Sequence, residues 1–179
     1  MIIGLTGLKG SGKSTAAKHI ESVYGFSRHN FKDALVAEIL DNFPDLLLLF
    51  KKYHHLNIDE LFSSKPEMMR ALMQNYGTEV RRGDDPNYWV RKWSQSLPDS
   101  NVVVDDVRFI NESESIREKD GVIIRIVRHD QEDDNDQHQS EQEQNQIKAD
   151  FTVYAGTGKQ EELYKQIDKV IHELKSNVD

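Results

Sequence analysis

Short apolar runs alternate along the chain with longer segments in which apolar residues recur at helical spacing. The runs predict buried strands at residues 2–6, 26–31, 101–104, 121–128 and 151–154. The helical spacing predicts helices at residues 14–24, 32–43, 86–97, 112–119 and 160–174, with a short helix at 46–53. Because strands alternate with helices, we expect an α/β fold whose parallel sheet is covered by helices on both faces.

One further helix start is predicted at Ser64-Lys65-Pro66-Glu67. This string has the form of a capping box, with serine at the cap, glutamate three residues later and proline in the first turn. We expect the helix to continue to Tyr76. The preceding residues, 44–63, show no clear periodicity apart from 46–53.

The composition restricts the classes of protein and of partner. Hydrophobic residues make up 37% of the 179 residues and charged residues 30%, which is typical of one globular domain. The net charge of −8 disfavours a nucleic acid polymer as partner, because such binding needs many cations, whereas a small phosphorylated ligand needs only a few. The lack of cysteine excludes disulfides and zinc–thiolate sites.

The chain shows no basic apolar leader, and its longest apolar run, residues 46–50, is far too short to span a bilayer. The absence of cysteine also fits a reducing compartment. We therefore expect a cytoplasmic protein without a membrane partner, located in the host cytoplasm if a phage encodes it. The sequence does not settle the oligomeric state, and a homodimer stays possible.

A phosphate-binding loop is predicted at Gly7-Leu-Lys-Gly-Ser-Gly-Lys-Ser14, which fits the pattern G-x-x-x-x-G-K-[ST] between a strand and a helix. The glycines let successive backbone N–H groups face one anion, and the helix dipole adds to the attraction. We expect Lys13 to bind the β- and γ-phosphates of a nucleoside triphosphate and Ser14 to ligate Mg²⁺. The expected nucleotide-binding residues here are Gly7, Lys9, Gly10, Ser11, Gly12, Lys13, Ser14 and Thr15.

Two adjacent acids, Asp105 and Asp106, follow the predicted strand at 101–104. A phosphate loop needs a carboxylate at the end of a neighbouring strand to organise Mg²⁺. In an extended strand the two side chains point to opposite sides, so only one faces the phosphates. Counting from the strand end favours Asp105, and the choice stays open. Arg108 follows in the next turn and could hold a second phosphate.

Four stretches together resemble the phage-type deoxynucleoside monophosphate kinases, in the family's order and over nearly the whole chain. They are the phosphate loop, Asp106-Val-Arg-Phe-Ile-Asn-Glu112, Arg70-Ala-Leu-Met-Gln-Asn-Tyr-Gly-Thr-Glu79 followed by Arg82, and His138-Gln-Ser-Glu141. The segment Phe31-Lys-Asp-Ala-Leu35 is similar to the family's F-A-D-P-L. The stretch Tyr154-Ala-Gly-Thr157 departs from the family, because it lacks the expected Asn before Gly-Thr.

The resemblance implies a P-loop NTPase fold with three α/β/α layers, adenylate-kinase-like, in a single domain over residues 1–179. It places a helical acceptor-binding region at about 32–98 and a lid at about 129–146. It also implies transfer of the γ-phosphoryl group of ATP to a deoxynucleoside monophosphate, with Mg²⁺. Arg70 and Arg108 would hold the acceptor phosphate, and Asp106 and Glu112 would be active-site carboxylates. The other substrate-binding candidates carried over are Asp33, His138 and Glu141.

Cations are expected around both phosphate groups, because two anionic substrates must meet in an acidic protein. Lys13 and Mg²⁺ serve the donor. Arg70, Arg82 and Arg108 are expected around the acceptor, since a guanidinium binds phosphate through two N–H groups. Trp89 could stack on the base or, as part of an apolar stripe, belong to the core, and both alternatives stay open.

Residues 130–143 contain seven acids and no Lys, Arg or apolar residue, so we expect them not to pack into a core. The predicted lid at 129–146 therefore lacks the arginines that typical lids bring over the phosphates. A plain solvated loop is the alternative. Arg128, on the strand just before, is the expected cation at the lid hinge and binds the nucleotide in this interpretation.

Two other functions stay open. A kinase for another small phosphorylated metabolite would share Lys13 and Asp106 but differ in its acceptor pocket. A nucleotide-binding switch would couple ATP to a partner's conformation. The chain has no N-K-x-D motif and no D-x-x-G after the strand that ends at Asp105, which argues against a switch.

Overall fold

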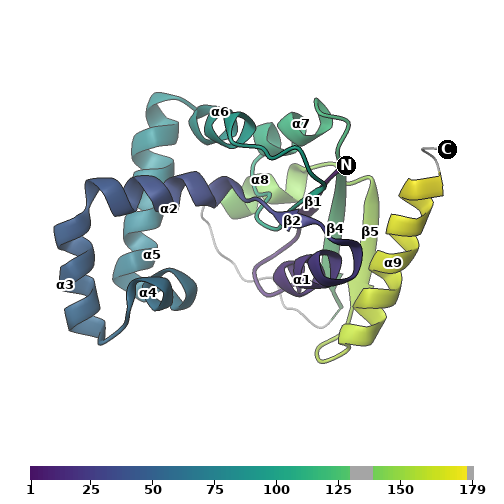
Figure 1. Cartoon of the computed structure of the whole chain (residues 1–179), viewed down its shortest axis with the longest axis horizontal. Helices are drawn as coiled ribbons and strands as arrows, with labels where there is room; N and C mark the ends of the chain where they lie inside the picture. Colours follow the sequence, from purple (N-terminus) through teal and green to yellow (C-terminus); the bar gives the residue numbers. More distant parts are fainter. Residues whose placement is uncertain (130–138, 177–179) are drawn as a thin grey trace. The chain divides into compact units, whose positions relative to one another are not determined.

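The computed structural model describes residues 1–129 and 139–176, and Figure 1 shows a parallel sheet among helices. The sheet has five strands in the order β2-β3-β1-β4-β5. Their bounds are β1 Ile2–Thr6, β2 Ser27–Arg28, β3 Val102–Val104, β4 Val122–Arg128 and β5 Phe151–Ala155. Since all neighbouring strands are parallel, the carboxyl ends of β1, β3 and β4 lie at one edge of the sheet with β1 between the other two.

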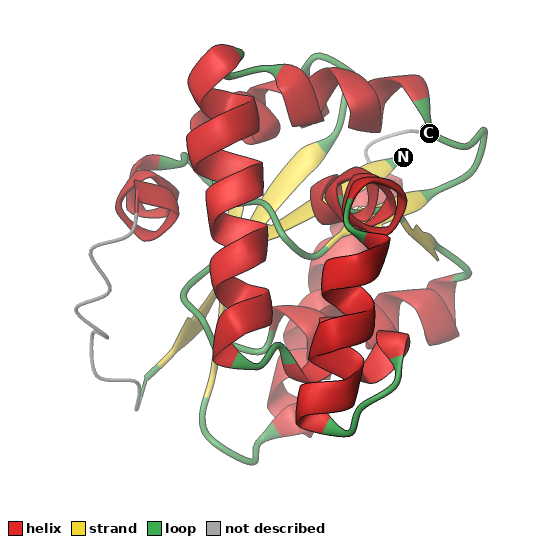
Figure 2. Ribbon diagram, turned by 90° about the vertical axis from the view of Figure 1, so that its left-hand side faces the viewer, coloured by secondary structure: helices red, strands yellow, loops and turns green. Residues whose placement is uncertain are grey.

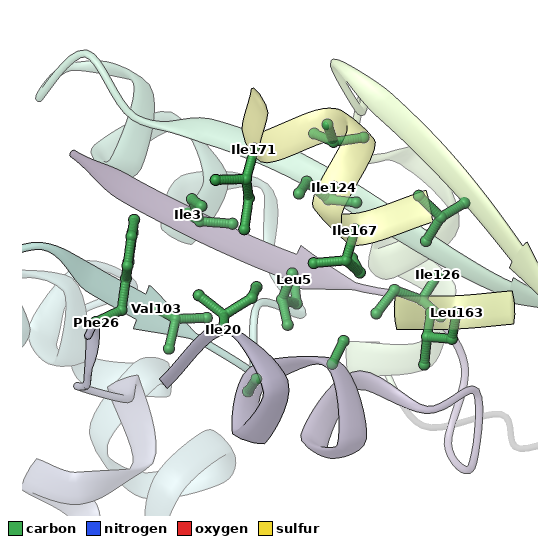
Figure 3. Packing of buried hydrophobic residues seen from close by; sticks show 14 of the residues in the cluster. Ile3, Leu5, Ile20, Phe26, Val103, Ile124, Ile126, Leu163, Ile167 and Ile171 are labelled. Atoms are coloured by element: carbon green, nitrogen blue, oxygen red, sulfur yellow. The ribbon is translucent and has the colours of Figure 1, made fainter. Parts of the chain in front are cut away.

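Helices cover the sheet on both faces, which confirms the predicted three-layer α/β/α arrangement. On one face Ile3 and Leu5 of β1 pack with α1 (Lys13–Tyr24) and α9 (Gln160–Ser176) in a cluster that Figure 3 shows from close by. On the other face Gly4 leaves room for α7 (Ile110–Arg117), because a Cβ on Gly4 would come within 2.8 Å of the Ile116 side chain.

The chain divides into two compact units. Met1–Asn30 and Leu97–Asp179 form the core unit, which holds the sheet, and Phe31–Ser96 form the helical unit, which consists of helices and loops alone (Figure 2). The helical unit contains α2 Phe31–Asn42, α3 Pro44–His54, α4 Ile58–Ser64, α5 Glu67–Gln74, η1 Asn75–Arg82 and α6 Tyr88–Gln95. Within the described ranges, no helix combines the length and apolarity needed to cross a bilayer.

The predicted capping box at Ser64 is wrong. Ser64 is the last residue of α4, where its hydroxyl donates to the Glu60 carbonyl at 2.6 Å, and α5 begins after Pro66 without a side-chain cap. The capping box lies at the start of α4 instead. There the Asn57 side chain accepts from the Glu60 N–H at 2.9 Å, and the Glu60 carboxylate accepts from the Asn57 N–H at 2.7 Å.

Three further elements differ from the predicted ones. The strand expected at 26–31 has only two residues, Ser27–Arg28, and Phe31, its expected last residue, already belongs to α2. The helix expected to run to Tyr76 changes after Gln74 into the π-helix η1, a wider form that side-chain periodicity does not reveal. Residues 139–146, in the segment expected to stay unpacked, form the helix α8 (Gln139–Gln146).

A network of polar side chains around Glu38 holds α2 to η1 and α6 in the helical unit. The Glu38 carboxylate accepts from the Tyr76 hydroxyl at 3.0 Å and from the Tyr88 hydroxyl, and it pairs with Arg81 at 3.0 Å and Lys92 at 3.3 Å. Burial raises the pKa of Glu38, but the bonds from the two tyrosines and Lys92 and the charge of Arg81 outweigh it. The net pKa lies below the usual 4.5.

Glu38→Gln should lower the free energy of unfolding at pH 7 by about 1–3 kcal/mol, because it leaves buried donors poorly satisfied. Since the folded pKa of Glu38 is lowered, its stabilisation is present above about pH 4.5 and is lost as the pH falls through the folded value. The difference between the variant and the unaltered protein should therefore shrink at pH 3. Urea unfolding followed by tryptophan fluorescence measures this, since Trp89 and Trp93 both lie in the helical unit.

The matched control is Asp41→Asn, a loss of an exposed carboxylate on the same helix. It should change the free energy of unfolding by less than about 0.5 kcal/mol at either pH. Equal losses for the two variants at pH 7 would contradict the role given to Glu38.

Candidate active site

The predicted phosphate loop lies between β1 and α1 and has the geometry of an anion site. Gly7, Gly10 and Gly12 have positive φ angles of 139°, 79° and 105°, which turn the loop back over the start of α1. The helix begins at Lys13 with no side-chain cap and no acid in its first turn. Its first N–H groups are therefore available to an anion, with the positive end of the helix dipole behind them.

The backbone of Gly7 passes very close to β4. A Cβ at this position would lie 2.2 Å from the carbonyl oxygen of Ile126 and 2.9 Å from the Ser11 hydroxyl. No side chain fits in that space, and the φ of 139° would strain any residue that has one. The loop can take this path only with glycine at position 7.

Lys13 and Ser11 place polar atoms inside the loop. Lys13 is only 9% exposed, and its ammonium group donates to the carbonyl oxygens of Gly7 and, at 2.9 Å, of Leu8. The Ser11 hydroxyl is buried and has no hydrogen-bond partner within the described residues. A bound triphosphate would give the Ser11 hydroxyl a partner and would offer Lys13 its phosphate oxygens, so this loop fits a nucleoside triphosphate. Of the other predicted loop residues, Lys9, Gly10 and Ser14 are exposed, and Gly12 and Thr15 are half-buried.

Asp105 and Asp106, at the end of β3, have different surroundings. Asp105 is buried, its N–H donates to the Asn30 side chain at 2.9 Å, and its carboxylate lies 3.5 Å from the guanidinium of Arg28. Arg28 also pairs with Glu21. Asp106 is half-buried. The Asp105 carboxylate thus faces Arg28 on β2, and which of the two acids organises Mg²⁺ stays a prediction.

Glu112 supports the turn that carries Arg108. It is buried, and one of its carboxylate oxygens accepts from the backbone N–H groups of Arg108 at 2.8 Å and Phe109 at 3.1 Å. These are N–H groups at the start of α7, where a negative charge is also favoured by the helix dipole. Glu112 therefore fixes the backbone of the turn at Arg108, and the Arg108 side chain is half-buried.

Arg128, at the end of β4, ties the phosphate loop to the loop between β5 and α9. Its guanidinium donates to the Gly10 carbonyl at 2.9 Å and to the Thr157 hydroxyl. It thus holds the tip of the phosphate loop, close to the expected nucleotide. The hinge role predicted for it depends on the residues after it, and residues 130–138 lie outside those described.

Gln144, which the sequence analysis missed, also belongs to this site. It lies on α8 and is 1% exposed, and its amide nitrogen donates to the Gly7 carbonyl at 2.6 Å. No pattern in the acidic, glutamine-rich segment around it distinguishes Gln144 from its neighbours. Of the two predicted lid residues, His138 lies outside the described residues, and Glu141 lies on α8 but its side chain is not described.

Comparison with known proteins places the chain in a family. The model of the family described as deoxynucleotide monophosphate kinase matches residues 45–167. The chain belongs to the deoxynucleotide monophosphate kinase family. A protein of Acanthamoeba polyphaga mimivirus that carries the name of such a kinase is 31% identical over 185 residues, which cover 93% of this chain and 94% of the viral protein.

Two solved structures of kinases align with nearly the whole chain. Shikimate kinase from Aquifex aeolicus is 17% identical with a TM-score of 0.47, and 99% of this chain and 98% of that chain are covered. Dephospho-CoA kinase from Campylobacter jejuni is 17% identical with a TM-score of 0.45, and 96% of each chain is covered.

The kinase carries its remaining predicted site residues in the helical unit. Arg70 is exposed on α5, and Arg82, at the end of η1, donates to the Pro86 carbonyl at 3.2 Å. Asp33 is exposed in the first turn of α2. Trp89 is only 3% exposed in the hydrophobic cluster of this unit, and its indole N–H donates to the Gly77 carbonyl at 2.8 Å. Of the two roles left open for Trp89, the structure shows the packing one.

Gly7→Ala should weaken ATP binding to this kinase by about 100-fold, because the new Cβ displaces the loop from its position against β4. Isothermal titration of the full chain with ATP and Mg²⁺ measures the affinity. Gly83→Ala is the matched control, since Gly83 has a helical φ of −61° and no atom within 4 Å of the added Cβ. It should leave the affinity unchanged and raise the free energy of unfolding by about 0.5 kcal/mol. Equal affinities of the two variants would contradict the constraint at Gly7.

Proposed function

We propose that the protein transfers the γ-phosphoryl group of ATP to a deoxynucleoside monophosphate and so produces a deoxynucleoside diphosphate and ADP. The observation that carries this proposal is the position of Lys13, inside an anion-binding loop at an uncapped helix start, in a chain that belongs to the deoxynucleotide monophosphate kinase family. Mg²⁺ is the metal that such a transfer uses.

On the donor side the chain offers backbone N–H groups, a cation and oxygen ligands. The loop and the start of α1 would bind the β- and γ-phosphates, and Lys13 would turn from the Gly7 and Leu8 carbonyls to their oxygens. Mg²⁺, when bound, neutralises charge on the phosphates. The Ser14 hydroxyl and the Asp106 carboxylate are the groups that would hold it.

The reaction forms one P–O bond and breaks one. An oxygen of the acceptor monophosphate attacks the γ-phosphorus, and the bond to the oxygen that bridges the β- and γ-phosphorus breaks, so that ADP leaves with the electron pair. The acceptor oxygen is already anionic, and therefore no strong base is needed. The residues have to bring two anions together and neutralise the transferred group.

On the acceptor side the proposal assigns cations to the monophosphate. The backbone N–H of Arg108 donates to the Glu112 carboxylate, which fixes the turn, and the proposal assigns the Arg108 guanidinium to the acceptor phosphate. Arg70 and Arg82 are the further candidates, and both lie within the segment matched by the family model. Arg81, adjacent to Arg82, pairs with Glu38 inside the helical unit instead.

ADP release should rise above the rate without acceptor when a deoxynucleoside monophosphate is added, and Lys13→Ala should abolish that rise. A coupled ADP assay with all four deoxynucleoside monophosphates and the ribonucleotides tests this and also measures base and sugar selectivity. A panel in which no monophosphate raises ADP release would refute the proposal. Release that rises only with a different phosphorylated metabolite would favour another small-molecule kinase.

Arg70→Ala should raise KM for the deoxynucleoside monophosphate by about 10- to 100-fold, since it removes a charge-assisted contact worth about 1.5–3 kcal/mol. KM for ATP should change less than about twofold, because Arg70 acts only on the acceptor. Steady-state kinetics with each substrate varied in turn separate the two effects. Arg91→Ala removes another exposed arginine of the helical unit, one that pairs with Asp85, and should change neither constant. Equal KM values for the two variants would contradict a role for Arg70 at the acceptor.

A further inference from the structure

The carbonyl oxygen of Gly7 accepts two hydrogen bonds from different parts of the core unit. One donor is the Lys13 ammonium group, and the other is the Gln144 amide at 2.6 Å. A carbonyl oxygen has two lone pairs and can accept from both donors at once. The same amide nitrogen lies 3.4 Å from the carbonyl of Val107, the residue between Asp106 and Arg108. Gln144 therefore lies between the phosphate loop and the turn that carries the proposed acceptor cation.

Gln144 is an unfavourable residue to bury unless its amide is needed. Gln144 is 1% exposed, and its side-chain amide lies next to the carbonyl oxygens of Gly7 and Val107. Because a carbonyl oxygen only accepts hydrogen bonds, the amide nitrogen has to face them. Its amide oxygen has no hydrogen-bond partner within residues 1–129 and 139–176. An apolar side chain would avoid that cost. What Gln144 supplies at this position is a neutral hydrogen-bond donor to Gly7.

The segment around Gln144 is anchored so that this donor stays in place. The Arg125 guanidinium on β4 donates to the Ile147 carbonyl and, at 3.3 Å, to the Gln144 carbonyl, next to the carboxyl end of α8. Ile147 is itself buried. The amide therefore approaches Gly7 from a fixed backbone, whereas the ammonium of Lys13 sits at the end of a long side chain that can turn away.

We propose that Gln144 is a positioning residue that lets Lys13 move from the Gly7 carbonyl to the phosphates of ATP. When Lys13 leaves, Gly7 keeps the hydrogen bond from Gln144, and its buried carbonyl stays satisfied. Without Gln144, Lys13 is the remaining one of these two donors to the Gly7 carbonyl. ATP binding then has to break the hydrogen bond between Lys13 and Gly7, and no other donor of this pair replaces it. This inference rests on the proposed function only in taking ATP as the ligand of the loop.

Gln144→Leu should weaken ATP binding about tenfold, the equivalent of leaving one buried acceptor unsatisfied in the bound state. Titration calorimetry of the full chain with ATP and Mg²⁺ measures the affinity, and thermal melting checks that the variant folds. Gln144→Met keeps the length of the side chain and gives the same test if the leucine variant does not fold. The control is Gln146→Leu, an exposed position on the same helix, which should leave the affinity unchanged.

A double-mutant cycle with Lys13→Met separates positioning from a general structural effect. In that background no ammonium has to leave Gly7 when ATP binds, so Gln144→Leu should weaken ATP binding less than about threefold. The same tenfold loss in both backgrounds, or a loss no larger than that of Gln146→Leu, would overturn the proposal. Failure of the unaltered chain to bind ATP would contradict the proposed function. An ATP affinity that does not change in Gln144→Leu would contradict only this inference.

Discussion

The backbone of Gly7 lies against β4 so closely that no side chain fits between them, and the rest of the site depends on this contact. Because the loop turns there, α1 begins directly after it, with no side-chain cap at its first turn. The same turn directs the Gly7 carbonyl to Lys13 on one side and to Gln144 on the other. The strands that neighbour β1 end beside this loop: Asp105 and Asp106 follow β3, and Arg128 at the end of β4 donates to the Gly10 carbonyl.

Several arginines of this acidic chain already pair with carboxylates. Arg28 is paired with Asp105 and Glu21, Arg81 with Glu38, and Arg117 with Asp150. These pairs hold the sheet and the helices together, and their guanidinium groups are engaged with carboxylates. A phosphate ligand must therefore be met by arginines that the fold does not occupy in this way. Arg70, which is exposed on α5, is in none of these pairs, and the sequence alone does not separate it from the structural arginines.

The parts that the sequence predicted are those whose signal is local. The phosphate loop was predictable because its backbone path requires glycine at fixed positions, and the strands because each is a short apolar run that is buried. Trp89 was not decided by the sequence, since whether an indole packs or stays free depends on Gly77 and the cluster around it. Gln144 was not predictable, because its role comes from a distant carbonyl at Gly7, and nothing in a polar, acidic stretch reveals a tertiary contact of that kind.

The string from Asp106 to Glu112 shows how one stretch of sequence combines two kinds of role. From their charges alone, Asp106, Arg108 and Glu112 would all be expected to face a ligand. In the structure the Glu112 carboxylate turns back to the N–H groups of Arg108 and Phe109 at the start of α7. An Asp at position 112 would be one carbon shorter and could not span the same turn with the same bonds. The length of the Glu112 side chain thus sets where the backbone of Arg108 lies, and one acid of this stretch has a structural contact that its sequence pattern does not reveal.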